Sequence, residues 1–290
     1  MGGKRKARKV IKKEREALHT SYQQKAPHNR LTQAFDKLRQ NKQKALIPFL
    51  AAGYPDLETS LTLASHALKG EADMLELGVP CADAPNDGPV IQKAYHKALE
   101  AGATTSKVFQ LVARLRQDTG KPLILMSYYK QVLQVGAKKF LTQMQKSGAD
   151  ALIIPDLPLK DCENLRADAT AHNLCFITMA TPGSTKEQYQ QAINAGSGFL
   201  YCASVAGVTG ARSEIPPQAI RMVQTLRRLT NLPLALGFGI SSRRQVAEAA
   251  PFVDGVIVGS ALLEGLKEKN VKGKTDFMTS FFSELRRGFE

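Results

Sequence analysis

The sequence predicts an α/β fold, a single (β/α)8 barrel of the TIM type, on three observations. From Asn29 onward, short apolar runs alternate with amphipathic segments, the pattern that builds parallel sheets from strand–helix units. Eight such runs occur, the number that closes a barrel. The chain has 290 residues, enough for a fold that takes about 250. A doubly wound open sheet is the alternative, although no G-x-G-x-x-G motif follows the first run.

Each expected strand is a short run bounded by polar residues, glycine or proline. In chain order the strands are 46–51, 74–77, 123–127, 151–154, 175–179, 199–203, 232–236 and 255–258. Between them, apolar residues recur at steps of three and four, which is typical of one helix face. These faces are Leu57/Leu61/Ala64/Leu68, Val108/Leu111/Val112/Leu115, Phe140/Met144, Leu165/Ala169 and Ile220/Val223. Gly70, Gly120 and Gly148 follow such segments, where glycine commonly ends a helix.

The first part of the chain differs from the rest in charge. Residues 1–30 hold ten Lys/Arg and two Glu, so eight of the fourteen net positive charges lie there. This part has few apolar side chains to bury. We therefore expect a disordered basic extension over 1–28 and a catalytic barrel domain over 29–290. Binding of nucleic acid by the extension is an alternative that the sequence favours less than a solvated tail.

Composition excludes several classes of protein. With 43% hydrophobic and 23% charged residues, the chain is globular, and its apolar runs are shorter than the roughly 18 residues of a membrane span. The four cysteines form no C-x-x-C pair, and the five histidines show no paired spacing. We expect a cytoplasmic protein with reduced thiols and no bound metal.

Glu76 stands out because it lies inside an expected strand that is otherwise apolar. In the run DMLELGVP, side chains alternate between two faces, so Glu76 shares a face with Met74. The leucines on the other face pack under helices, and Glu76 is predicted to point into the barrel mouth. Loss of hydration raises the pKa of such a carboxyl toward the range useful for acid–base chemistry. An ion pair would make it structural, but no basic residue lies from Met74 through Asn86.

Asp87 follows in the loop CADAPNDGP, at the end of the barrel where active sites lie. A turn or a helix N-cap would explain this aspartate by itself. Together with Glu76, however, it gives two carboxyl groups in different environments, which can take different roles. We predict an acid–base pair.

Three glycine motifs suggest an anionic ligand, because each lies where a late strand gives way to a loop or helix. They are GVTGAR at 207–212, GFGISS at 237–242 and VGSALL at 258–263. Backbone N–H groups there can point at phosphate oxygens, and the last loops of such barrels are the usual phosphate position. The predicted phosphate-binding residues are Gly210, Gly239, Gly259 and Ser260.

Five motifs in this order resemble the α subunit of tryptophan synthase: LIPFLAAGYPD, LELGVPCADAPNDGPVIQ, LIIPDLP, SVAGVTGAR and LGFGISS. The resemblance runs from about Asn29 to the C-terminus. It implies a barrel that cleaves indole-3-glycerol phosphate into indole and glyceraldehyde 3-phosphate. It also implies a partner β subunit that uses pyridoxal phosphate, in an α2β2 heterotetramer, so that the α chain needs no cofactor of its own.

The resemblance also assigns roles to residues. The family's acid–base glutamate falls on Glu76, which would protonate indole C3 and accept a proton from the glycerol hydroxyl. Its aspartate falls on Asp87, which would accept a hydrogen bond from the indole N–H. Its phosphate contacts fall on the four residues already named, and Thr209 matches a mobile-loop threonine. Its indole pocket falls on Phe49, Tyr128, Tyr201 and Phe238.

The chain departs from the family at two places. The family run Ser-Asp-Pro-Leu-Ala-Asp-Gly-Pro reads Ala-Asp-Ala-Pro-Asn-Asp-Gly-Pro over 82–89. Lys130 and Gln131 stand where the family usually has asparagine and proline. Both places are expected to face the β subunit. The alternatives are a stand-alone lyase that releases free indole, and an inert barrel whose basic tail binds nucleic acid.

Overall fold

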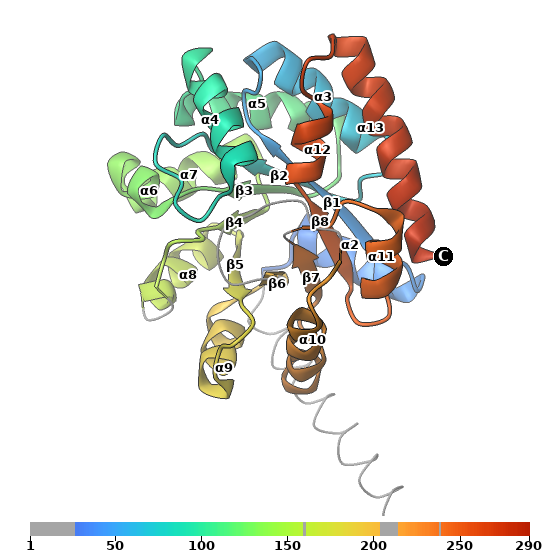
Figure 1. The fold of residues 1–290 in the computed structure, drawn as a ribbon. Helices are drawn as coiled ribbons and strands as arrows, with labels where there is room; N and C mark the ends of the chain where they lie inside the picture. Colours follow the sequence, from blue (N-terminus) through green and yellow to red (C-terminus); the bar gives the residue numbers. More distant parts are fainter. Residues whose placement is uncertain (1–26, 159–160, 204–213, 238) are drawn as a thin grey trace, which may run out of the picture.

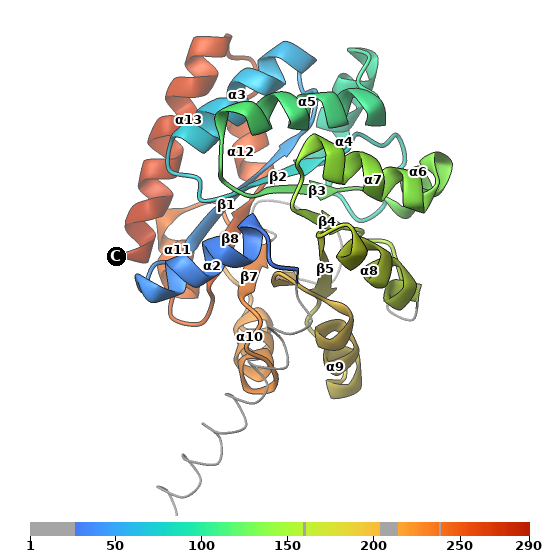
Figure 2. The ribbon, with the colours of Figure 1, turned by 180° about the vertical axis from the view of Figure 1, so that it is seen from behind.

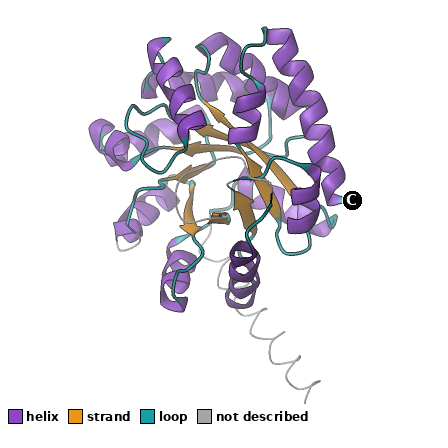
Figure 3. Ribbon diagram, viewed as in Figure 1, coloured by secondary structure: helices purple, strands orange, loops and turns teal. Residues whose placement is uncertain are grey.

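Eight parallel strands close into one barrel, each paired with the next along the chain and the last with the first (Figures 1 and 3). The computed structural model describes residues 27–158, 161–203, 214–237 and 239–290. The strands are β1 (Ala45–Ala51), β2 (Leu75–Gly78), β3 (Leu123–Met126), β4 (Ala151–Ile153), β5 (Cys175–Ala180), β6 (Leu200–Ala203), β7 (Leu234–Gly237) and β8 (Gly255–Val258). Every strand end lies within two residues of its predicted position, so the barrel is confirmed and the open sheet is wrong.

The strands are buried on both faces, because inner side chains fill the barrel and outer ones pack under the helices. Among the described strand residues, Met179 alone is not fully buried. The helices are α2 (Arg30–Gln40), α3 (Leu57–Lys69), α4 (Pro89–Glu100), α5 (Thr105–Asp118), α6 (Tyr129–Val135), α7 (Ala137–Ser147), α8 (Cys162–Ala171), α9 (Lys186–Ala195), α10 (Pro217–Leu229), α11 (Arg243–Ala249), α12 (Ser260–Gly265) and α13 (Val271–Arg286), followed by the short 3-10 helix η2 (Arg287–Phe289).

The predicted helical faces lie on α3, α5, α7, α8 and α10, and α5 shows why they form. Its N-cap Thr104 accepts a hydrogen bond from the Lys107 backbone, and its four predicted apolar residues are all buried. Gly148 ends α7 with a φ of 84°, as a glycine C-cap does. Gly70 ends α3 with a φ of −92°, whereas α5 ends at Asp118 with Thr119 as its C-cap, so Gly120 does not cap it.

Helix α2 covers the amino-terminal end of the barrel (Figure 2). Asn29 caps this helix, and its Nδ2 also donates to the Asp150 and Asn173 carbonyls, 2.8 and 2.9 Å away. The Arg30 guanidinium pairs with Asp150 at 2.8 Å. The functional site is therefore expected at the opposite end, where the strands run into their helices.

The predicted extension lies mostly outside the described residues, so its disorder stays a prediction. Pro27 and His28, its last two residues, are described. Pro27 is buried and its carbonyl accepts a hydrogen bond from the Thr32 hydroxyl at 3.2 Å. Contact with the barrel therefore begins by residue 27.

Candidate active site

A pocket opens at the carboxyl ends of the strands, where the sequence analysis expects the site. Strands β1, β2, β3, β6 and β8 each contribute a side chain, and loops, α4 and the start of α12 contribute the rest. Its lining residues are Phe49, Glu76, Asp87, Ile91, Met126, Tyr201, Gly239, Ile257, Gly259 and Ser260. Seven residues that the sequence predicts for the site are therefore brought together here.

Glu76 lies on β2 beside Phe49 of β1, since the two are paired in the strand register. It is 2% exposed, and its Oε2 has no hydrogen-bond partner in the described part of the chain. No described Lys or Arg forms an ion pair with it either. Burial, together with the charge of Asp87, raises the pKa of Glu76 to about 8. Glu76 therefore holds a proton at neutral pH, as a general acid must.

Asp87 lies in the loop between β2 and α4 and is 4% exposed. The Tyr128 hydroxyl donates a hydrogen bond to its Oδ2 at 2.9 Å. Burial raises the pKa of Asp87 to about 6, and the bond from Tyr128 limits that rise. The N-cap of α4 is Gly88, so helix capping does not account for this aspartate.

Two glycines at strand ends let aromatic rings lie against the site. A Cβ atom on Gly78 would come 2.6 Å from the Phe49 ring, and one on Gly237 would come 2.6 Å from the Tyr201 ring. Any side chain there would push the ring aside. Small residues at the ends of β2 and β7 therefore set the positions of two pocket walls.

The described part of the predicted phosphate site lies at the ends of β7 and β8. Gly239 follows β7 with a φ of 87°, and Gly259 caps α12, which begins at Ser260. Gly210, Thr209 and Phe238 lie outside the described residues, so no contact of theirs is stated.

Two residues named in the sequence analysis form contacts that the sequence did not predict. The Tyr128 hydroxyl donates to Asp87, and Tyr128 is not among the described residues that line this pocket, so its place in an indole pocket stays a prediction. Gln131 was expected to face a partner, but its side chain turns inward and donates to the Pro80 carbonyl at 2.6 Å. Proline has no such donor, so a proline at position 131 could not form this bond to the loop after β2.

Three lining residues were missed: Ile91, Met126 and Ile257. Met126 and Ile257 lie on strands, and the alternation argument that identified Glu76 could have found them. Ile91 follows Asp87 by four residues and lies on the buried face of α4. All three are apolar, as expected for a pocket that takes an aromatic ring.

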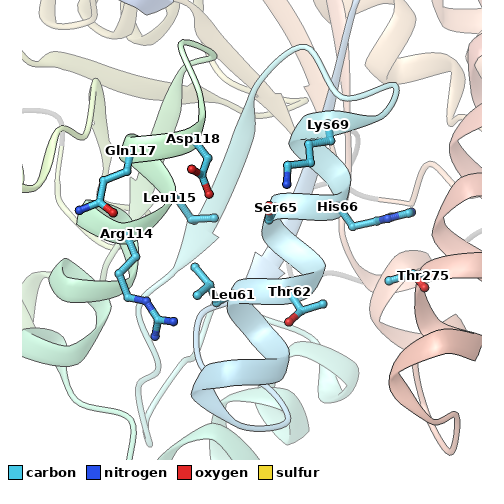
Figure 4. Close-up of a pocket in the computed structure, with 10 residues that line it drawn as sticks. All are labelled: Leu61, Thr62, Ser65, His66, Lys69, Arg114, Leu115, Gln117, Asp118 and Thr275. Atoms are coloured by element: carbon cyan, nitrogen blue, oxygen red, sulfur yellow. The ribbon is translucent and has the colours of Figure 1, made fainter.

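A second cavity, of about 510 Å³, lies outside the barrel between α3, α5 and α13 (Figure 4). Arg114 in its wall pairs with Glu58 at 2.6 Å, and the His66 ring bonds to Thr279 at 2.8 Å. These groups already have protein partners, and the groove contains no strand end. The catalytic candidates are therefore those of the barrel mouth.

The described residues show no sign of a metal centre or of a membrane span. No group of three or more His, Cys, Asp or Glu side chains is placed there to hold a metal ion. None of the described helices has the length and apolar character that crossing a membrane requires. All four cysteines are buried free thiols.

Known proteins similar to this chain include tryptophan synthase alpha chains and structures of tryptophan synthase. A family model described as "Tryptophan synthase alpha chain" matches residues 35–286. The tryptophan synthase alpha chain of Carboxydothermus hydrogenoformans is 42% identical over 236 residues, which cover 81% of this chain and 88% of the relative. That of Geotalea daltonii is 39% identical over 259 residues, 89% and 98% of the two chains. A structure of Mycobacterium tuberculosis tryptophan synthase superposes with a TM-score of 0.82 at 34% identity, covering 90% and 98%.

Proposed function

The chain belongs to the tryptophan synthase alpha chain family, and from that premise we propose that Glu76 and Asp87 carry out the family's reaction. This reaction, which makes the chain a carbon–carbon lyase of tryptophan biosynthesis, cleaves indole-3-glycerol phosphate into indole and glyceraldehyde 3-phosphate. One observation carries the proposal. Two buried carboxyl groups line one pocket with pKa values of about 8 and about 6, so at neutral pH one is protonated and the other charged.

Glu76 moves the protons of the reaction. The carbon next to indole C3 carries no carbonyl, so the ring must become the electron sink. Glu76 donates its proton to C3, and the resulting carboxylate takes the proton of the neighbouring hydroxyl. The O–H electrons form the aldehyde, the carbon–carbon bond breaks, and its electrons restore the indole ring. Glu76 ends the cycle protonated, and its burial supports this role because a poised acid needs a pKa near the working pH.

Asp87 stabilises the charge that this protonation creates. Protonation at C3 makes the ring cationic, with the charge spread onto N1. A fixed carboxylate that accepts the N1–H hydrogen bond favours the cation over the neutral ring, which lowers the barrier. The hydrogen bond from Tyr128 supports this role, because it favours the charged form of Asp87 and holds the carboxyl in place.

The rest of the pocket binds the two ends of the substrate. Phe49 and Tyr201, together with Phe238 and Tyr128, form the indole side, although Tyr128 acts mainly through Asp87. The backbone of Gly210, Gly239, Gly259 and Ser260 binds the phosphate, with Thr209 on the adjoining loop. Support comes from Gly239, Gly259 and Ser260, which line the same pocket as the two carboxyl groups.

No step of this scheme requires a cofactor, because the protonated ring itself accepts the electrons. We propose that pyridoxal phosphate is held by a partner β subunit, which consumes the indole. Structures of tryptophan synthase among the relatives support partnering with a β subunit, and we propose an α2β2 assembly in the cytoplasm. We propose that residues 29–290 form the catalytic domain and that the basic extension over 1–28 lies outside it.

The test is the release of glyceraldehyde 3-phosphate from indole-3-glycerol phosphate by the isolated chain and by Glu76→Gln. The amide keeps the shape of the side chain but exchanges no proton, so the rate falls at least about 100-fold. Circular dichroism confirms that the variant is folded. Retention of more than a tenth of the rate would reject Glu76 as the acid. Catalysis by the isolated chain at its full rate, with no stimulation by any β subunit, would favour a stand-alone lyase.

A further inference from the structure

The loop that carries Asp87, residues 79–88, is tied to its neighbours by two amide side chains. Asn86 donates from Nδ2 to the Pro155 carbonyl, 2.9 Å away in the loop after β4. Gln131, in the first turns of α6, donates from Nε2 to the Pro80 carbonyl at 2.6 Å. Its Oε1 accepts a hydrogen bond from the buried Ser127 hydroxyl at 3.2 Å. Three successive strand ends, those of β2, β3 and β4, are thereby joined.

These links lead directly to the Asp87 carboxyl. The Tyr128 hydroxyl accepts a hydrogen bond from the Asn86 backbone N–H at 3.2 Å and donates its own proton to Asp87. The Tyr128 hydroxyl has a single proton. Because its oxygen accepts the bond from the Asn86 N–H, that proton is directed to the Asp87 carboxyl. The position of residue 86 therefore determines whether this bond forms.

We propose that Asn86 and Gln131 are positioning residues that hold Asp87 and its bond from Tyr128 in the geometry used in catalysis. The proposal rests on the proposed role of Asp87. Loops at the end of a barrel are the mobile part of the scaffold, whereas stabilisation of a developing charge needs a group that is already in place. The family run has alanine and proline at these two positions, and neither side chain can form these links.

The experiment compares Asn86→Ala and Gln131→Met with the unaltered chain and with the control Gln134→Met. Gln134 is an exposed residue of the same helix for which the described structure gives no side-chain bond. Methionine keeps the length of glutamine and removes its donor. Each test variant is expected to lower kcat about 10-fold and the double variant further, with KM for indole-3-glycerol phosphate changed less than twofold. The control keeps both constants.

Two further readouts separate positioning from a general loss of structure. Losing the bond from Tyr128 raises the pKa of Asp87, so the acid limb of the kcat–pH profile moves to higher pH in the test variants only. Hydrogen exchange of the backbone amides of 81–88 becomes at least several-fold faster, while exchange in the strands is unchanged. The conservative Asn86→Gln and Gln131→Asn variants test whether the length of the amide side chain matters. Their kcat is expected to lie between that of the Asn86→Ala and Gln131→Met variants and that of the unaltered chain.

The outcomes are distinct. Unchanged kcat, or an unmoved acid limb, overturns the proposal, even when Glu76→Gln is inactive and the proposed function stands. Loss of kcat that tracks loss of folded protein across temperature also overturns it, because the amides then act on stability alone. An unaltered chain that releases no glyceraldehyde 3-phosphate removes the proposed function, and the positioning role with it, whatever the exchange rates show.

Discussion

At the scale of the residue, the protonation states of Glu76 and Asp87 predict how activity depends on pH. The proposed mechanism needs a charged Asp87 and a protonated Glu76, so kcat is expected to rise as pH passes about 6 and to fall as it passes about 8. The phenols packed around them stay protonated over this range, because burial raises the pKa of Tyr95, Tyr128 and Tyr201. A steady-state profile from pH 5 to 9.5 measures both limbs.

The Asp87→Asn variant provides the check on this assignment. It removes the group that titrates near pH 6, so the acid limb should disappear from what activity remains. It also removes the charge that helps to keep Glu76 protonated, so the basic limb should move to lower pH. A basic limb that stays in place would contradict the link between the two carboxyl groups.

The same buried glutamate predicts a dependence of stability on pH. Its pKa rises from about 4.5 to about 8 on folding, so the folded state binds the proton more tightly. The stability that this proton contributes is complete below pH 4.5 and is lost as the pH rises through 8. The Glu76→Gln variant has no such pH-dependent loss. Its free energy of unfolding relative to the unaltered chain therefore increases between pH 5 and pH 8, by on the order of a few kcal/mol. Urea midpoints at pH 5, 6.5 and 8 measure this gain, and a difference that does not change with pH would argue against burial of the charge.

At the scale of the element, the strands could be predicted because each is a short apolar run between clear boundaries. Among the described helices, the sequence analysis did not predict α2, α4, α6, α9, α11, α12 and α13. Two of them show little apolar pattern, since α2 buries only Leu31 and Phe35 and α6 only Val132. Pairs that lie far apart in sequence were also beyond prediction. The bonds from Asn86 and Gln131 join residues 69 and 51 positions apart, and no periodicity within one element encodes them.

The buried carboxyl group of Asp150, just before β4, predicts how much the stability of the fold depends on a single charge. Asp150 accepts bonds from Arg30, Arg116 and the Leu123 backbone, at 2.8, 2.7 and 2.9 Å, which joins α2, α5 and β3. Asp150→Ala leaves the largely buried guanidinium of Arg116 without this partner, and the free energy of unfolding should fall by about 3 kcal/mol.

Denaturant unfolding of Asp150→Ala and of Asp118→Ala gives the comparison. Asp118 is exposed in the groove of Figure 4 and forms no ion pair with any described residue, so its loss should change stability by no more than about 0.5 kcal/mol. Equal losses of unfolding free energy in the two variants would show that the Asp150 network contributes no more to stability than an exposed aspartate does.

At the scale of the whole molecule, the two ends of the barrel have different tasks. Helix α2 and the Asp150 network cover the amino-terminal end, while the pocket and the loops after β2, β3 and β4 occupy the other. This division is predictable from the fold class alone, since such barrels carry function at the carboxyl ends of their strands. Which loop contacts another, and which faces a partner, depends on single side chains.

The surface around these loops predicts how the chain couples to a β subunit. Lys130 is exposed on α6, near the 56% exposed Leu133, and stands where the family usually has asparagine. A lysine that loses water on binding without gaining an acidic partner weakens the interface. Because Gln131 faces inward, the change in the interface is expected at Lys130 and at the residues around Ala84. We expect this chain to couple well to its own β subunit and poorly to one from a pair with the usual family residues.

The measurement is the stimulation of indole formation as each β subunit is titrated into the isolated chain. Ala84→Pro combined with Lys130→Asn should restore coupling to the more typical β subunit, because it removes the exposed charge and returns the proline to its family position. The Ala84 carbonyl still accepts its bond from Gln92 in this variant, so the Asp87 loop keeps its anchor. Lys146→Asn, at an exposed lysine of α7, is the control and should leave coupling unchanged. Equal stimulation of the unaltered chain by both β subunits would show that these departures lie outside the determinants of coupling.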